Sequence, residues 1–126
     1  MTPKETILKA LNSASDYSGI VASLIEVGVQ SYTVDVATGT MLYRLSDENV
    51  VLYGKVSPRS ISLQFSSRLI KKAIEDSKLG LIDYSTFLDD IAKAGVLFYE
   101  VKLNGNNKKA TYIGIGDAYE QDFSDF

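Results

Sequence analysis

The sequence has 126 residues and contains no cysteine, no histidine and no tryptophan. Without cysteine there are no disulfides and no thiolate metal sites. Without histidine there is no Ser–His or Cys–His nucleophile and no imidazole metal ligand. Acid–base chemistry would have to come from carboxylates, lysine or tyrosine. These absences argue against an enzyme and predict neither a metal nor a cofactor. The lack of cysteine also agrees with a reducing, cytoplasmic location.

Long apolar runs and an excess of positive charge are missing as well. No apolar run approaches the ~20 residues of a membrane span, and the first residues lack the apolar core of a signal peptide. The formal net charge is −3, whereas a surface that binds nucleic acid is basic. We therefore expect neither a membrane nor a nucleic acid as partner. The composition, 45% hydrophobic and 23% charged, is typical of a globular chain, and we expect a single domain over residues 1–126.

Hydrophobic periodicity predicts four helices. The first begins with Thr2 and Glu5 in the spacing of a capping box, and the second ends at Gly28, which suits a left-handed cap. The third falls around residues 66–79, and the fourth begins at the cap residue Asp83. Alternation of apolar and polar residues predicts five strands, which we place at residues 32–36, 41–45, 50–53, 96–103 and 110–115.

The connections carry further expectations. A two-residue turn at Thr38-Gly39 would place Val34 opposite Tyr43. Residues 55–66 are rich in serine and are predicted to be mainly a loop. The acidic end, residues 116–126, is predicted to lie loosely on the surface.

An internal repeat appears when the sequence is compared with itself at an offset of 67 residues. The matched sets are Asp16-Tyr17-Ser18 with Asp83-Tyr84-Ser85, Gly28-Val29 with Gly95-Val96, Tyr32 with Tyr99, and Val34 with Val101. Any helix followed by a strand wants a cap, a glycine and alternating apolar residues, so convergence is the alternative explanation. The shared Asp-Tyr-Ser and the shared tyrosine favour duplication, with pseudo-repeats at about 3–54 and 66–115.

These patterns predict an α+β fold made of a duplicated helix–helix–β-hairpin unit. The first strands of the two copies would pair antiparallel at the centre of a sheet of about five strands, with four helices on one face. The opposite face would expose the apolar residues Leu42, Phe98, Ile113 and Ile115. This is more apolar surface than a solvated sheet needs, and it predicts a homodimer through that face or an edge strand.

Tyrosine is the residue type that offers a candidate binding site. The sequence has eight tyrosines, whose rings are apolar and whose hydroxyls seek polar partners. Four of them are predicted to line a ligand pocket between sheet and helices, namely Tyr32, Tyr43, Tyr99 and Tyr112; the alternative is that they are ordinary residues at the edge of the core. Asp89-Asp90 with Glu100 and the acidic tail could bind a divalent cation. Adjacent aspartates on a helix point in different directions, however, and the tail lacks the spacing of a calcium loop, so no metal site is predicted.

The chain also resembles a known family. The resemblance is carried by Gly28-Val29-x-x-Tyr32-x-Val34 after a helix, by Asp83-Tyr84-x-x-Phe87, and by Ala94-Gly95-Val96 before a strand that enters a hairpin. Over about residues 17–115 it is similar to the YbcV-like family, small bacterial and prophage-borne proteins of unknown function. The resemblance implies no activity and no site; some members are described as phage envelope proteins. The strand at 50–54 and the serine-rich loop depart from the family pattern.

Three functions stay open from the sequence. The favoured one is a non-catalytic module that binds a protein or a small ligand, because the usual catalytic residue types are missing and one sheet face is partly apolar. The second is a small-molecule-binding domain or minimal enzyme that uses a pocket of tyrosines and carboxylates. The third is a structural or accessory protein of a phage or prophage, which gene neighbours would test.

Overall fold

The computed structural model describes residues 2–13, 17–54, 58–104 and 108–122. Over these residues the chain forms four helices and six strands, which confirms the α+β class with one strand more than expected. In chain order the elements are α1 (Pro3–Leu11), α2 (Tyr17–Glu26), β1 (Ser31–Asp35), β2 (Met41–Arg44), β3 (Asn49–Leu52), α3 (Ser67–Lys78), α4 (Tyr84–Lys93), β4 (Phe98–Lys102), β5 (Lys109–Gly114) and β6 (Asp117–Asp122).

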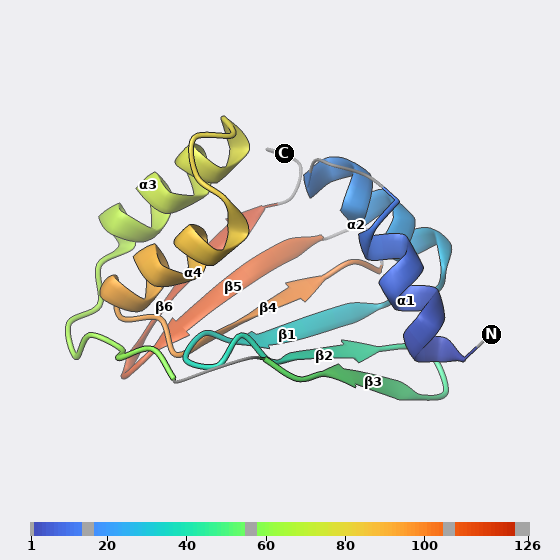
Figure 1. The fold of residues 1–126 in the computed structure, drawn as a ribbon. Coiled ribbons are helices and arrows are strands. Elements are labelled where there is room, and N and C mark those ends of the chain that lie inside the picture. Colours follow the sequence, from blue (N-terminus) through green and yellow to red (C-terminus); the bar gives the residue numbers. More distant parts are fainter. Residues whose placement is uncertain (1, 14–16, 55–57, 105–107, 123–126) are drawn as a thin grey trace.

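All six strands belong to one antiparallel sheet with the order β3-β2-β1-β4-β5-β6. The strands β1 and β4 pair at its centre. The four helices lie over the same face as two pairs, α1 with α2 and α3 with α4 (Figure 1). Helix α1 packs on the edge strand β3 and α3 on the opposite edge strand β6. No described helix is long and apolar enough to cross a bilayer.

The sheet order divides the molecule into two halves with the same sequence of elements. The N-terminal half contains α1, α2 and β1–β3, and the C-terminal half contains α3, α4 and β4–β6. Adding 67 to the bounds of α2 and β1 gives the bounds of α4 and β4. In the outer strands the offset is 69, because Tyr43 opposite Val50 corresponds to Tyr112 opposite Tyr119. The C-terminal half is therefore longer by two residues between its first two strands.

The helix ends repeat in hydrogen-bonding detail. Gly28 and Gly95 both have positive φ, 95° and 88°. Each follows its helix with the same two backbone bonds, from the glycine N–H to the carbonyl three residues back and from the next N–H to the carbonyl five residues back. This is the left-handed helix end that the sequence predicts. The predicted capping box of Thr2 and Glu5 and the Asp83 cap are confirmed, whereas Asp16 lies outside the described residues.

The first hairpin corrects a predicted register. Val34 pairs with Met41 and Tyr32 with Tyr43, two residues away from the expected pairing. The turn is longer than two residues, since the Asp35 N–H donates to the Thr40 carbonyl and the Gly39 N–H to the Asp35 carbonyl. A shift of two leaves each side chain on the face it was predicted to occupy.

The prediction of a loose acidic tail is wrong for residues 117–122, which form β6 along the full length of β5. The acidic residues Asp117, Glu120 and Asp122 are exposed, while Tyr119 points to the helix side and its ring lies 6.3 Å from that of Tyr112. One inward aromatic residue among outward charges is enough to pair the segment as an edge strand, and exposed charges are what edge strands normally carry.

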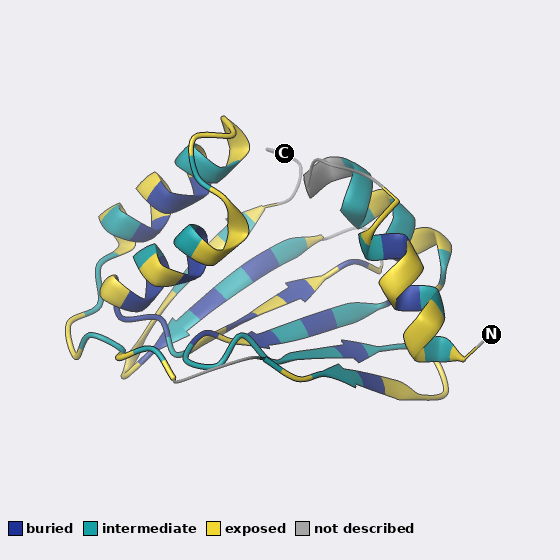
Figure 2. Ribbon diagram, viewed as in Figure 1, coloured by how far each residue is buried: buried dark blue, intermediate teal, exposed yellow. Residues whose placement is uncertain are grey.

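The core fills the space between the helices and the sheet. Buried positions alternate along the strands and recur on the inward side of each helix (Figure 2). In the central strands the inward residues are Tyr32, Val34, Tyr99 and Val101, each at most 4% exposed. The predicted loop is also present: residues 58–66 form no helix or strand and are fastened to α4 by an Arg59–Asp89 ion pair of 2.6 Å.

Candidate functional site

The four tyrosines predicted to bind a ligand all lie on the helix side of the sheet and are at most 4% exposed. They form two cross-strand pairs, one in each half. The rings of Tyr32 and Tyr43 are 5.4 Å apart, and those of Tyr99 and Tyr112 are 5.1 Å apart. The tyrosines thus repeat as a structural pair of the fold.

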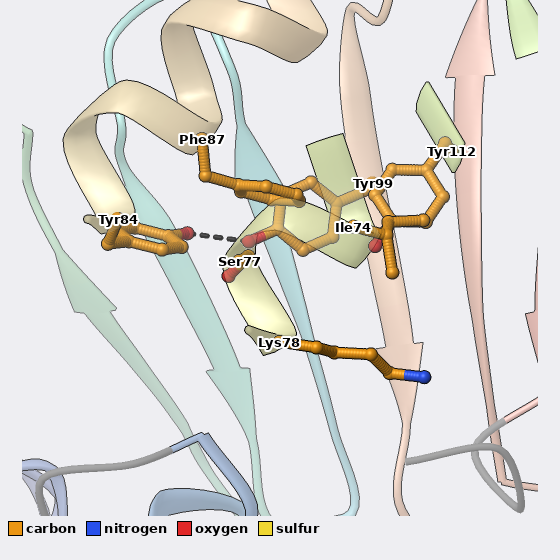
Figure 3. Close-up of a pocket in the computed structure, with 7 residues that line it drawn as sticks. All are labelled: Ile74, Ser77, Lys78, Tyr84, Phe87, Tyr99 and Tyr112. Carbon is orange, nitrogen blue, oxygen red and sulfur yellow. Dashed lines mark hydrogen bonds between the residues drawn. The ribbon is translucent and has the colours of Figure 1, made fainter. Parts of the chain in front are cut away.

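The tyrosine pair of the C-terminal half borders an open pocket. A cavity of about 40 Å³ opens between the helices and the sheet; its lining residues are Ile74, Ser77, Lys78, Tyr84, Phe87, Tyr99 and Tyr112 (Figure 3). They come from the last two turns of α3, the first turn of α4 and the strands β4 and β5. A space of this size holds about three water molecules. Tyr32 and Tyr43 are not among the lining residues.

Aromatic rings form most of the pocket wall. Tyr84 and Phe87 are stacked with centroids 6.1 Å apart and planes at 24°. Phe87 meets Tyr99 edge-on at 6.2 Å and Tyr112 at 6.5 Å. These separations are within the range of favourable aromatic packing. The wall therefore presents ring faces and ring edges around a common space.

Polar atoms reach the pocket from two sides. The hydroxyls of Tyr84 and Tyr99 share a hydrogen bond of 2.6 Å, drawn as the dashed line in Figure 3. Ser77 and Lys78 also line the pocket, from the last turn of α3. The ammonium group of Lys78 is the only formal charge among the seven lining residues. The arrangement can therefore offer hydroxyl groups and one positive charge beside an aromatic surface.

Two carboxylates that are adjacent in sequence to lining residues have partners elsewhere. Asp83 accepts a hydrogen bond of 2.8 Å from the Thr86 N–H, which lowers the pKa of its carboxyl and keeps it ionised as the cap of α4. Asp76 accepts from Lys72 at 2.8 Å, and this bond raises the pKa of the lysine. Both acids are thus engaged with their own helices.

Sequence reasoning missed five of the seven lining residues. Helical spacing places Ile74, Ser77 and Lys78 on one side of α3, but the polar members of such a stripe read as ordinary surface residues. In the sequence, Tyr84 and Phe87 stand out as landmarks of the repeat and the family pattern, and neither pattern assigns them to a site. The connection between two helices decides where these residues meet the sheet, and its geometry cannot be read from periodicity.

The residues predicted to form an interface lie on the helix-free face, but not in one patch. Phe98 pairs with Ile113, and Ile115 follows the last residue of β5. Leu42 lies two strands away and pairs with Thr33. Between them runs a polar strip, where Arg44 donates to Thr33 at 2.6 Å and lies 3.8 Å from Glu100.

The residues considered for a metal do not form a site. Asp89 pairs with Arg59, and Glu100 lies on the helix-free face near Arg44. Within the described ranges, no three carboxylates gather closely enough to hold an ion.

The fold and the pocket define a class: an α+β domain whose helix-covered sheet face carries an aromatic pocket in one of two matching halves. The chain belongs to a family whose description reads "Protein of unknown function (DUF1398)", and the match extends over residues 5–118. No curated protein is similar enough to count as a relative.

Proposed function

We propose that this protein is a non-catalytic module that binds a small molecule in the pocket of its C-terminal half. The observation that carries the proposal is the convergence of four aromatic rings, four hydroxyl-bearing side chains and one ammonium group on a single open space. Binding sites in proteins combine apolar walls with a few placed polar groups in this way. Nothing in the pocket supplies a nucleophile paired with a base, which favours binding over catalysis.

The pocket lies in one of the two matching halves. The helix ends, the central strands and the tyrosine pairs recur in both halves and serve the fold. We propose that they descend from a duplication with pseudo-repeats at about 3–54 and 66–115, and that the C-terminal copy acquired the site. The equality of the α2 and α4 bounds after an offset of 67 supports this origin.

Isoleucine methyl NMR tests the binding proposal with an internal control. Ile74 lines the pocket, and Ile7, 67 residues earlier, is buried under the other pair of helices. In protein labelled at isoleucine methyls we expect small probes (phenol, indole, benzamide and sodium hexanoate) to shift the Ile74 signal saturably at millimolar concentration. The Ile7 signal should stay in place. Equal shifts at both methyls, or no saturable shift by any probe, would contradict the proposal.

A second proposal is self-association through the helix-free face. Phe98, the first residue of β4, is 37% exposed and pairs with Ile113, and Ile115, which follows the last residue of β5, is 61% exposed. We propose that these two and Ile113 form the contact of a homodimer, with Leu42 outside it. Size-exclusion chromatography with light scattering at high concentration tests this, and a clean monomer would count against it.

The narrower YbcV-like assignment and a link to prophages stay proposals that the neighbouring genes would test.

A further inference from the structure

We propose that the open edge of β3 binds an extended peptide segment of a partner protein, which joins the sheet as an added strand. The segment would carry apolar residues on the side that faces α1. This site is separate from the pocket, whose lining comes from α3, α4, β4 and β5. Backbone geometry, an apolar helix flank, the charge of the two sheet edges and the position of α1 support the inference.

The backbone of β3 directs two residues toward the open edge. The Leu45 N–H donates to the Glu48 carbonyl at 2.9 Å, so these residues form a hydrogen-bonded pair beside the hairpin turn. In an antiparallel ladder such pairs alternate with pairs that are not bonded to each other. Val50 is therefore bonded to β2, whereas Asn49 and Val51 direct their N–H and C=O groups away from it. Within the described part of the chain, no other group bonds to these outward groups.

Helix α1 stands over this edge and presents an apolar side chain beyond it (Figure 1). Ser13, which follows α1, bonds to Ser23 of α2 at 2.7 Å, and the buried Ala10 lies on the same flank of the helix. Leu8 lies about 160° round the helix from Ala10 and so faces away from α2. It is 40% exposed. An apolar side chain of a strand added beside β3 could be buried against Leu8.

Charge distinguishes this edge from the opposite one. The strand β6 corresponds to β3 in the other half, and its residues Glu120 and Asp122 are exposed. Exposed charges hinder an edge strand from pairing with another chain, and β3 has none over Asn49–Leu52. On the helix above, the exposed Glu75 of α3 stands at the position of Leu8 after an offset of 67. The edge of the N-terminal half therefore lacks the charges that the C-terminal half carries at both places.

The position of α1 leaves room for one added strand but not for a second copy of the chain. Helix α1 packs on β3 itself, and neighbouring strands lie about 4.8 Å apart. If two copies paired through β3, their α1 helices would stand over adjacent strands, whereas packed helices need about 8–10 Å between their axes. A segment that brings no helix avoids this clash. Other proteins bind extended peptides by adding a strand to an open sheet edge in this way.

Amide hydrogen exchange in the free protein tests whether the edge is open. We expect the Val51 amide to exchange at least about tenfold faster than the Val50 amide, because only the latter is bonded within the sheet. A Val51 amide that is protected at high protein concentration and exchanges freely on dilution would mean that a second copy occupies the edge. That result would overturn the assignment to a peptide partner.

Three blocked eight-residue peptides then test binding. In each, threonine alternates with valine, isoleucine or phenylalanine, and a lysine at one end and a glutamate at the other keep the peptide soluble without net charge. At millimolar concentration we expect at least one peptide to shift the amide signals of Asn49 and Val51 saturably and to slow exchange of the Val51 amide. The Glu120 amide, at the equivalent position of β6, is the internal control and should not respond. The same peptides with Pro-Pro at their centre lack the central N–H donors and should have no effect.

Variants assign the binding to the edge and to α1. Val51→Pro removes an outward N–H without removing a bond to β2 and should weaken peptide binding at least about tenfold. Glu120→Pro is the matched change on β6 and should leave binding unchanged. Leu8→Glu copies Glu75 and should weaken binding about fivefold, and Leu81→Glu makes the same change at another exposed leucine as the control. Thermal melts check that each variant folds; Leu8 is exposed, so its variant tests the site even if Val51→Pro does not fold.

Three results would overturn the proposal. One is that none of the three peptides gives a saturable shift at Asn49 and Val51. Another is that the Glu120 amide responds as strongly as the Val51 amide, because the peptide then does not distinguish the two edges. The third is that folded Leu8→Glu binds the peptides as well as wild type does. None of these results bears on the pocket, which is tested separately by the Ile74 methyl signal.

Discussion

The N-terminal and C-terminal halves of this molecule have the same order of elements, and the same helix-to-strand junction recurs in each. Leu24 and Ile91 are both fully buried on the last helix of their half, and the two glycines that follow have nearly the same φ. The halves differ at the end of their first helix, where apolar Ala10 and Leu11 in one half correspond to Ser77 and Lys78 in the other. They also differ in aromatic content, since Ile20 corresponds to Phe87.

This difference separates what the fold needs from what it leaves free. Positions that match between the halves have a structural reason: a cap, a positive φ or an inward side chain on a central strand. At positions that differ, the fold does not require one particular residue. Three of the seven residues that line the pocket, Ser77, Lys78 and Phe87, stand at positions that differ between the halves, and the other four match. The three differing residues are what distinguishes the pocket from the corresponding region of the other half.

Truncation of a buried side chain should lower the free energy of unfolding more than any other change, and equivalent positions in the two halves should give the same decrease. We expect Leu24→Ala and Ile91→Ala each to lower the free energy of unfolding by about 3 kcal/mol, because each side chain is at most 1% exposed and its removal leaves a cavity. Urea unfolding followed by far-UV circular dichroism measures both. A difference above about 2 kcal/mol would show that the halves do not share one cooperative core.

Replacement of the two helix-ending glycines by alanine should cost a different amount of stability in each half. Both need a positive φ, so replacement by alanine costs about 1 kcal/mol at either site. At Gly28 an added Cβ meets nothing within 4 Å, whereas at Gly95 it would lie 2.6 Å from the carbonyl oxygen of Gln64. Backbone cannot give way as a flexible side chain does, so we expect Gly95→Ala to cost about 2 kcal/mol more than Gly28→Ala.

The same unfolding measurement checks this pair. Equal costs at the two glycines would mean that the loop before α3 moves away without penalty, and that the close approach of residues 64 and 65 to the helix end is not part of the stable core.

The comparison also shows how much of the fold could be predicted from the sequence. The offset of 67 led to the central pairing of β1 with β4, the helices on one face and the inward tyrosines, because local signals at caps, glycines and alternating strands carry that information. The hairpin register was missed, since Thr38-Gly39 resembles a two-residue turn and the actual connection is longer. The predicted faces of the strand were still correct, because side chains alternate between the two faces and a shift of two residues keeps Tyr32 and Val34 on the helix side.

The edge strand β6 and the pocket could not be predicted from the sequence, for a different reason in each case. A segment rich in Asp and Glu with one inward Tyr119 has too weak an alternation to stand out. The pocket depends on how α3, α4 and two strands meet, which is tertiary information. The sequence could supply two of its residues, Tyr99 and Tyr112, because they repeat; it could not supply Ser77 and Lys78, because a repeat hides whatever is peculiar to one copy.

The smallest predicted effect concerns the helix caps and appears only in acid. The hydrogen bond from the Thr86 N–H lowers the pKa of Asp83 in the folded protein. A carboxyl whose folded pKa lies below its unfolded value adds stability above the unfolded pKa, near 3.8, and loses it as the pH falls through the folded pKa. Wild type should therefore lose stability below about pH 4, and Asp83→Asn, which can still cap but cannot titrate, should lose less. Thermal melts between pH 2.5 and 7 measure how steeply stability falls with pH, with Asp90→Asn as the control for removing one carboxylate from α4.

Asp16→Asn then tests the other half. If it reduces the pH dependence of stability as Asp83→Asn does, the equivalence extends to the helix start that the sequence predicts there. An unchanged pH dependence would confine the Asp cap to the C-terminal half.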